Sequence, residues 1–470
     1  MPQVVEVRKK HCVAAICCLS LGVLMISRPL LAEAQAAGSG LWGVNGHDPS
    51  VDVKASGAVE TDPGADIILK SSQASSKSFG ATLVVDGASF AKHEVVMTAD
   101  LSVLSGAGEG VLWMRADSAG GGREYTSSLP VAIAEGSASA THPIEVRADV
   151  PTGAIKMSLG VAFKGQAVAH FARVKLQTVR TLPTSPSPAA VLDAALTVIR
   201  AHALHADRVN WDQASAEAHK ATAEAEVPVD VYPAIRQIFG LLGDRHSSLS
   251  NPYQARALAA SGGSADSVAI RRADDGILYL NMPSYRGHES EAASAYVATV
   301  RQKISDAGDA KGWIIDLRSN SGGNMWPMLS ALQPFLGNGK IGSFVAKDKS
   351  TPWFPSDHAT GSERANATLI NVPVALLLGP RTASSGEIVA VAFHGRPNAR
   401  SFGTHTAGFS TSNAEFPLPD GSVLHLSTSV AADRNGALFE DGLIPDQIID
   451  GGDTHAAEAA AVSWIRQQHP

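Results

Sequence analysis

Cysteine is almost absent from this chain, and its distribution is informative. The sequence has three cysteines, Cys12, Cys17 and Cys18, and all of them lie in the first 34 residues. Without that segment the chain has no thiol, which excludes disulfides, thiol catalysis and cysteine-ligated metal sites. Phosphate loops, dinucleotide fingerprints and metal-ligand clusters are missing as well, so we expect neither a cofactor nor a metal. A lack of cysteine also suits an oxidising compartment.

Long apolar runs and a basic surface are missing too. Beyond residue 34 no stretch is apolar for long enough to span a bilayer, so we expect no membrane span in the mature chain. The formal charge is -7 and no basic tract stands out, which argues against nucleic acid or an anionic membrane as a partner. No Gly-x-Ser-x-Gly elbow occurs, so the sequence does not support an esterase of the α/β-hydrolase type.

The N-terminal segment has the features of an export signal. Three basic residues at 8–10 precede an apolar core at 12–26 that is too short to favour a spanning helix, and small residues follow at 32–36. We therefore predict a signal peptide over residues 1–34, cleaved after residue 34 or 36. The mature protein is expected in the periplasm or outside the cell.

The rest of the chain changes character three times. Residues 38–180 are rich in glycine, serine, valine and alanine with short alternating runs, which predicts an all-β sandwich. Residues 181–189 form a Pro/Ser linker. Helical patterns over residues 190–252 follow, and residues 253–470 alternate strand and helix patterns, which predicts an α/β catalytic core. The chain is thus expected to be multidomain.

The β-rich part resembles the jelly-roll accessory modules related to carbohydrate-binding domains, through runs at 112–115, 150–155 and 172–176. That resemblance leaves several roles open: a glycan, peptidoglycan or protein ligand, or support of the catalytic region. Trp113 is interpreted as a core residue rather than a sugar platform, because aromatic side chains fill sandwich cores.

A serine stands at the start of a predicted helix near the middle of the catalytic region. The apolar run at 372–378 suits a buried strand that ends at Gly379, and a helical pattern then runs to Gly395. Ser384 lies between them, where free backbone N–H groups and the helix dipole stabilise an oxyanion. Taken alone, a serine in this place is more often a helix cap.

Two further stretches place functional groups at the ends of predicted elements. A helical pattern ends at a glycine and delivers Asp244, His246 and Ser247 into a loop. A later strand pattern runs into Gly322 and Gly323, whose bare backbone N–H groups are in reach of a ligand. Taken singly, the histidine would be a hydrogen-bonded loop residue and the glycine pair a tight turn.

Together, these stretches resemble the C-terminal processing, or tail-specific, serine peptidases, a family that includes the tricorn core and the repeats of interphotoreceptor retinoid-binding protein. The resemblance covers residues from about 190 to 450 and implies a crotonase-like core of repeated strand-strand-helix units. Six runs in the family's order carry it, at 242–249, 315–323, 382–388, 404–408, 418–421 and 440–446.

The resemblance implies roles for individual residues. Ser384 matches the nucleophile, and the oxyanion hole is implied at the backbone N–H of Ser385 and at the Gly322–Gly323 turn. Each such donor is typically worth roughly 3 kcal/mol in the transition state. The glycines should therefore matter as much as the nucleophile.

The implied base is a histidine. Phe409 stands at the position of the lysine used by the Ser-Lys branch of the family, and no lysine follows Lys349. His246 falls at the position of the histidine in the tricorn-like branch, where a neutral pKa suits a base that later returns the proton. Glu440 matches the acid that would orient it.

Several alternatives stay open around this base. Arg245 stands where the tricorn core has a serine, so Ser247 or Ser248 is a substitute for that serine. Asp244 is a rival for the acid that orients the histidine. His405 is a rival base, because a role as base depends on geometry.

The segment between Tyr253 and Ile277 is too short for a PDZ domain, the family's usual device for capturing a substrate C-terminus. We therefore predict an exported serine endopeptidase or carboxy-terminal processing-like peptidase without assuming tail specificity. It would cleave polypeptides through an acyl-enzyme on Ser384, with His246 as general base. The alternative is a catalytically inactive ligand- or peptide-binding protein on the same fold.

Overall fold

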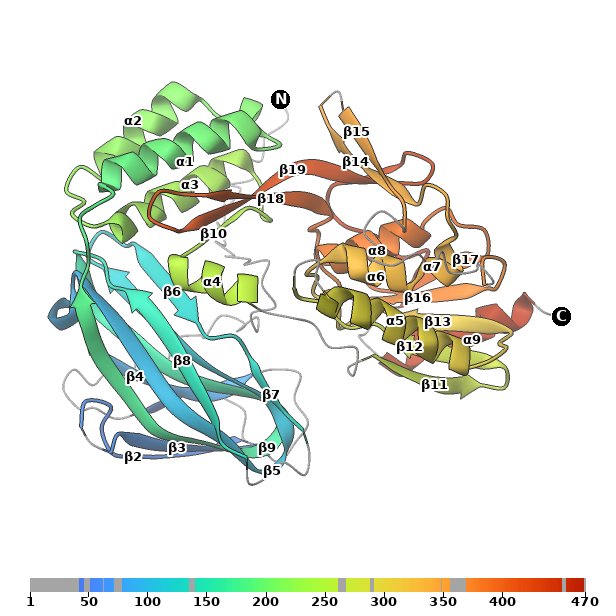
Figure 1. The fold of residues 1–470 in the computed structure, drawn as a ribbon, viewed down its shortest axis with the longest axis horizontal. Helices are drawn as coiled ribbons and strands as arrows, with labels where there is room; N and C mark the ends of the chain where they lie inside the picture. The colour runs from blue at the N-terminus through green and yellow to red at the C-terminus, as the bar shows by residue number, and fades with distance from the viewer. Residues whose placement is uncertain are drawn as a thin grey trace, which may run out of the picture.

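The computed structural model describes residues 42–45, 51–61, 63–71, 78–134, 140–260, 268–287, 291–347, 349–355, 369–449 and 454–468. The predicted signal peptide lies outside these residues. Figure 1 shows a β-rich N-terminal region at lower left, three helices above one end of it, and a mixed α/β region at right. Among the described residues, no helix combines the length and the apolar character needed to cross a bilayer.

The N-terminal region, called the β-region here, is built around two long antiparallel strands. These are β5 (His93–Ser118) and β9 (Ala154–Thr181), which pair with each other along most of their length. The sheet-rich character predicted for residues 38–180 is confirmed, and a jelly-roll connectivity stays a prediction. The other strands join these two directly or through a neighbour: β1 (Gly43–Asn45), β2 (Val51–Ser56), β3 (Ala65–Ser71), β4 (Phe79–Asp86), β6 (Arg123–Ser127), β7 (Val131–Ile133) and β8 (His142–Asp149).

Both long strands pass through glycines at the same level. Gly108 of β5 pairs with Gly165 of β9, with φ values of 159° and 140°. A Cβ on Gly165 would lie 2.3 Å from the carbonyl oxygen of Ala107, so the backbones approach too closely for a side chain there. On either side of this level β9 pairs with different strands, with β4 before it and β3 after it. The long strands β5 and β9 thereby run through both parts of the β-region, the part with β4 and the part with β3.

Trp113 lies on the opposite face of the sheet from the main core of the β-region. Its neighbours in sequence, Leu112 and Met114, belong to the main core, whereas Trp113 packs in a small separate cluster with Tyr125. A Cβ on Gly160 would overlap the indole ring, so the ring lies flat over that glycine. Trp113 is buried, as expected of a packing residue, but on the second face.

Three helices follow the linker and form a small core of their own. These are α1 (Pro188–His202), α2 (Trp211–Ala221) and α3 (Tyr232–Leu242). Ser187 and Asn210 cap the first two, accepting hydrogen bonds from backbone N–H groups of the first turns. The third ends at Gly243, which has a φ of 68° and therefore takes the left-handed conformation common after helices. The chain enters the Asp244–His246 loop directly from this glycine.

The α/β region is organised by a six-stranded sheet. Its strands, in spatial order, are β11 (Ala269–Asp274), β12 (Ile277–Asn281), β13 (Gly312–Asp316), β16 (Val374–Leu378), β17 (Ala399–Gly403) and β21 (Gln447–Ile448). All pairs are parallel except β11 with β12. Because β13 and β16 are adjacent, the turns that leave their carboxyl ends meet at one edge.

Helices cover both faces of this sheet. The side chains of α5 (Glu291–Asp306), α6 (Met325–Ala331), α7 (Gln333–Leu336) and α8 (Ser385–Phe393) pack into one core, and α9 (Thr454–Gln467) packs into another core on the other face. Strands β13 and β16 are buried throughout, which explains their continuously apolar sequences. The sheet edge that carries the turns is thus held rigidly. A crotonase-like identity of this core stays a prediction.

A second six-stranded sheet connects the helical part with the α/β region. Its central strand, β19 (Val423–Asp433), contributes Leu424 and Leu426 to the helical core and Ala431 to the core of the parallel sheet. In Figure 1 the β18–β19 hairpin runs between the two parts. The remaining strands pair with β19 or with β14: β10 (Ser248–Ser250), β14 (Gly342–Ala346), β15 (Lys349–Trp353), β18 (Thr411–Pro417) and β20 (Leu438–Phe439).

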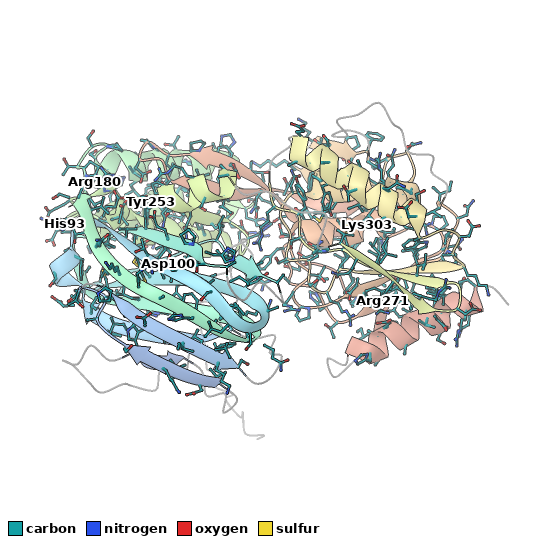
Figure 2. All side chains as sticks on the ribbon, turned by 60° about the horizontal axis from the view of Figure 1, so that its bottom comes forward. His93, Asp100, Arg180, Tyr253, Arg271 and Lys303 are labelled. Atoms are coloured by element: carbon teal, nitrogen blue, oxygen red, sulfur yellow. The ribbon has the colours of Figure 1, made fainter. Side chains whose placement is uncertain are left out.

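The β-region is bonded to the segment that flanks the Asp244–His246 loop. The hydroxyl of Tyr253, in α4 (Pro252–Ala260), donates a hydrogen bond of 2.7 Å to Asp149 of β8. Asp230, just before α3, accepts bonds of 2.8 and 2.7 Å from Thr152. Figure 2 shows Tyr253 close to Arg180 of β9, where the β-region meets the helices. These contacts fix the β-region on both sides of that loop.

An ion pair at this interface gives a test of stability. Arg236 of α3 pairs with Glu124 of β6. Burial raises the pKa of Glu124, whereas the charge of Arg236 lowers it, so Arg236→Met leaves a buried carboxyl without its partner. We expect the free energy of unfolding in urea at pH 7 to fall by about 3 kcal/mol. Adding Glu124→Gln should recover much of that loss. A loss under about 0.5 kcal/mol would show that the pair behaves as an exposed one.

Candidate active site

Ser384 lies in a strained turn between β16 and α8. Its φ of 51° and ψ of -122° belong to a backbone region that residues with side chains rarely adopt. The turn is held by a hydrogen bond of 3.0 Å from the N–H of Ala383 to the carbonyl of Asn320. A Cβ on Gly386 would lie 2.4 Å from that same carbonyl, so only glycine allows this approach. The turn presents a partly exposed serine at the start of a helix.

His246 faces Ser384 from the loop after α3. Its Nε2 lies 3.1 Å from the Ser384 Oγ, and its Nδ1 lies 2.7 Å from the Thr411 Oγ1. The imidazole stacks on Phe409, with 5.4 Å between ring centroids. Asn413 donates a hydrogen bond of 3.1 Å to the histidine carbonyl. A neutral imidazole with its proton on Nδ1 donates to Thr411 and leaves Nε2 free to accept the serine hydroxyl.

A chain of hydroxyls leads from the histidine to a carboxylate. The Thr411 Oγ1 lies 3.0 Å from the Ser427 Oγ, which in turn lies 3.2 Å from an oxygen of Asp244. Asp244 also accepts hydrogen bonds from the backbone N–H of His246 at 2.7 Å and from the hydroxyl of Ser247. Asp244 therefore orients the imidazole both through its backbone and through the two hydroxyls.

Burial sets the protonation state of the histidine. The His246 side chain is almost completely buried, and desolvation lowers its pKa to about 4. The charge of Asp244 opposes this shift and raises the pKa, while a charged His425 would lower it further. Desolvation wins, so the imidazole is neutral near pH 7. A neutral imidazole is the form that can accept a proton from serine.

A buried carboxylate, Glu387, joins the two sides of the site. It is fully buried and accepts hydrogen bonds from the backbone N–H groups of Ser384 at 2.9 Å, Gly408 at 2.8 Å and Phe409 at 2.7 Å. The hydroxyl of Thr406 donates a fourth, at 2.5 Å. Burial raises the pKa of Glu387, and these four donors lower it. Glu387 thus ties the serine turn to the loop that carries Phe409.

Two backbone N–H groups at the serine are free to bind an oxyanion. Among the described residues, the backbone N–H groups of Gly323 and Ser385 donate no hydrogen bond. The Ser385 hydroxyl donates a bond of 2.6 Å to the Gly323 carbonyl, which holds the two turns together. The N–H of Gly322 is engaged, because it donates to the Asn320 side chain at 3.1 Å. Of the three positions expected for the oxyanion hole, Gly323 and Ser385 have a donor to offer.

Glu440 lies elsewhere than the sequence pattern implied. Its carboxylate accepts from the Nε2 of His205 at 2.8 Å and lies 3.7 Å from Arg208, between α1 and α2. Within the described residues it makes no hydrogen bond to His246, whose acid partner is Asp244. The side chain of Glu440 thus points toward the helices, and its role in orienting the histidine stays a prediction. The rival base His405 is exposed, with its Nδ1 2.6 Å from the Thr406 carbonyl.

Three residues of the site escaped the sequence analysis as functional groups. Thr411 and Ser427 lie on β18 and β19, and their meeting depends on a strand pairing that local sequence does not reveal. Glu387 lies in the run at 382–388, which carries the family resemblance without assigning it a role. The Ser-x-x-Glu spacing at a helix start is a capping-box signal and could have identified it. None of the described residues forms a cluster of His, Cys, Asp or Glu that could hold a metal ion.

Comparison with known proteins finds relatives of this region. Residues 276–449 match the model of peptidase family S41. The nisin-resistance protein of Lactococcus lactis subsp. lactis is 26% identical over 292 residues, covering 60% of this chain and 88% of that protein. A solved structure of a lipoprotein from Streptococcus agalactiae is 25% identical, with a TM-score of 0.53, and covers 62% of this chain and 100% of the other.

Proteins named for carboxy-terminal processing are also similar. The processing protease CtpA of Bacillus subtilis (strain 168) is 29% identical over 143 residues, which is 29% of either chain. The carboxy-terminal-processing protease of Bartonella bacilliformis is 24% identical, over 38% of this chain and 40% of that protein. The chain thus spans less than half the length of these two. The family match includes Ser384 and Glu387, whereas His246 and Asp244 precede it.

The lowered pKa of His246 predicts an unusual pH dependence. The rate at which a fluorophosphonate modifies Ser384 should stay level from pH 8 down to about 5 and fall toward pH 4, because the base is lost only as pH falls through its folded pKa of about 4. An ordinary histidine would lose the rate near 6.5. Between pH 6.5 and pH 4 the unfolded chain binds a proton at this histidine and the folded chain does not, so the free energy of unfolding decreases as the pH is lowered. Circular dichroism must therefore confirm that the protein is folded at each pH. A midpoint at or above 6.5 would contradict the assignment.

Proposed function

We propose that this chain is a serine-type peptidase that hydrolyses peptide bonds through an acyl-enzyme on Ser384 with His246 as general base, because residues 276–449 match the model of peptidase family S41. One observation carries the proposal, the 3.1 Å contact between the Ser384 Oγ and the Nε2 of a buried histidine. Nucleophile and base are within hydrogen-bond reach, and the lowered pKa keeps the base neutral. The family's lysine is not needed in this arrangement.

In the first step, the Ser384 Oγ attacks the carbonyl carbon while its proton passes to Nε2 of His246. The carbonyl oxygen gains negative charge, which the N–H groups of Gly323 and Ser385 are placed to stabilise, each by roughly 3 kcal/mol. The imidazolium formed in this step keeps its Nδ1–H bonded to Thr411. When the C–N bond breaks, Nε2 gives its proton to the leaving amine and the acyl group stays on the serine.

In the second step, a water molecule attacks the acyl carbon and gives a proton to the same Nε2. The C–O bond to Ser384 then breaks, and the proton returns to the serine oxygen. Asp244 supports both steps because its negative charge, relayed through Ser427 and Thr411, favours the transient imidazolium. The hydroxyls fix the direction of the ring while the carboxylate supplies the charge.

The binding-protein alternative has less support. A non-catalytic protein has no use for a serine in a strained turn, a neutral histidine against its hydroxyl and two free N–H groups beside it. The signal-like composition of residues 1–34 supports export of the protein, which is part of the proposal. N-terminal sequencing of the protein released by the producing cell tests this part. The name of the nisin-resistance relative makes nisin a sensible first peptide to assay.

The reaction of Ser384 with a fluorophosphonate tests the nucleophile and the base. We expect a single adduct on the wild-type protein, no adduct on Ser384→Ala, and a rate at least about 100-fold lower on His246→Ala. Intact-mass spectrometry measures all three. An adduct on folded Ser384→Ala, or no adduct on the wild type, would contradict the proposal.

The two acids can be separated by matched substitutions. Asp244→Asn should slow the labelling of Ser384 by about tenfold or more, because the imidazolium loses its counter-charge and its backbone anchor changes. Glu440→Gln, which removes the same charge from the ion pair with His205, should change the rate by less than about twofold. If Glu440→Gln were the slower variant, the acid of the relay would be Glu440 after all.

A further inference from the structure

An arginine beside the candidate oxyanion site has no bonded partner among the residues that the structure describes. Arg286 lies in the loop after β12, and its Cγ would be 3.5 Å from a Cβ on Gly323. It is partly exposed, and among the described residues no hydrogen bond or ion pair involves it. Arg318, by contrast, makes a two-pronged contact with Asp316. A partly buried guanidinium is costly when its N–H donors lack partners, and those of Arg286 have none among the described residues, so they are available to a ligand.

The β-region places an acid within electrostatic reach of this arginine. Burial lowers the pKa of Arg286, and the negative charge of Glu109 raises it. Glu109 belongs to β5 and alternates along the strand with Val111 and Trp113, so all three share the face of the sheet opposite the main core. No hydrogen bond joins Glu109 to Arg286 in the described part of the chain.

A second cation borders the site on the histidine side. Arg245 is exposed and its guanidinium lies 5.5 Å from the centre of the Phe409 ring, which stacks on His246. No carboxylate pairs with it among the described residues. Two arginines without a bonded partner among the described residues thus lie close to the site, one beside Gly323 and one beside Phe409, in a chain whose formal charge is -7.

We infer that Arg286 binds a carboxylate of the peptide substrate next to the bond that Ser384 attacks. This inference rests on the proposed peptidase function. The planar fork of a guanidinium matches a carboxylate through two parallel hydrogen bonds, and partial burial strengthens them. The carboxylate is that of an Asp or Glu side chain or of the peptide's own C-terminus.

Competition for Ser384 tests the inference without requiring turnover. Matched hexapeptides carry Glu or Gln at each position in turn and end in a free acid or an amide. The readout is the peptide concentration that halves the rate of fluorophosphonate labelling. On the wild type, this concentration should be about tenfold lower for a carboxylate peptide than for its neutral partner, because hydrogen bonds to charged groups are stronger. The Glu/Gln and acid/amide arms show which carboxylate is bound.

Substitutions assign the effect to Arg286. In Arg286→Gln the ratio between neutral and carboxylate peptides should fall to near one, with each peptide compared with the rate at which fluorophosphonate alone labels that same variant. Arg286→Lys should retain part of the ratio. The control Arg200→Gln removes a charge from the exposed end of α1 and should leave the ratio intact.

The outcomes separate this inference from the proposed function. A wild-type protein that takes no label would overturn both. A labelled wild type with a ratio near one, or a ratio that Arg286→Gln leaves unchanged, would overturn the carboxylate subsite alone.

Discussion

The active site depends on one buried carboxylate. Glu387 is fully enclosed, and an ionised carboxylate in that position is tolerated only if donors surround it. Its four donors come from the serine turn and from the loop at 406–409, so satisfying the charge forces these two segments together. The same loop carries Phe409, whose ring covers the imidazole of His246. One anion at a helix start, where the dipole also favours it, thereby fixes both the nucleophile and the neighbour of the base.

Burial, more than any charge, gives the histidine its role. Asp244 acts to raise the pKa of His246, yet desolvation lowers it to about 4, so the loss of water outweighs the acid. Phe409 contributes to this dry environment at the position where the resemblance led us to look for a lysine. Because two hydroxyls stand between the acid and the ring, Asp244 orients the imidazole while the ring stays neutral until it accepts the proton. A direct carboxylate contact would raise the pKa of the ring, which would make the imidazole a stronger base but leave less of it neutral near pH 7.

The parts of the site that sequence predicts are those set by local pattern. The apolar run before Gly379, the glycine that ends α3 and the glycine pair after β13 each place a backbone turn, and each turn lies where the pattern indicates. The relay is different, because Thr411 and Ser427 meet only through the register of β18 and β19, which shifts at a bulge between Ser412 and Asn413. Glu440 shows the limit of motif matching. A motif can fix the course of a loop, but which way its side chain points depends on neighbours such as His205, far away in sequence.

The β-region is part of the same physical system as the active site. On the N-terminal side of the base, the β-region contacts Asp230, which precedes α3, and Arg236 of α3. On the C-terminal side it contacts Tyr253. The short segment between these anchors carries His246 and Asp244. Because the β-region contacts both ends of the loop that holds the base, a shift of the β-region would move the base relative to Ser384. The β-region is therefore better understood as a structural support of the loop that holds the base than as a separate module on a linker.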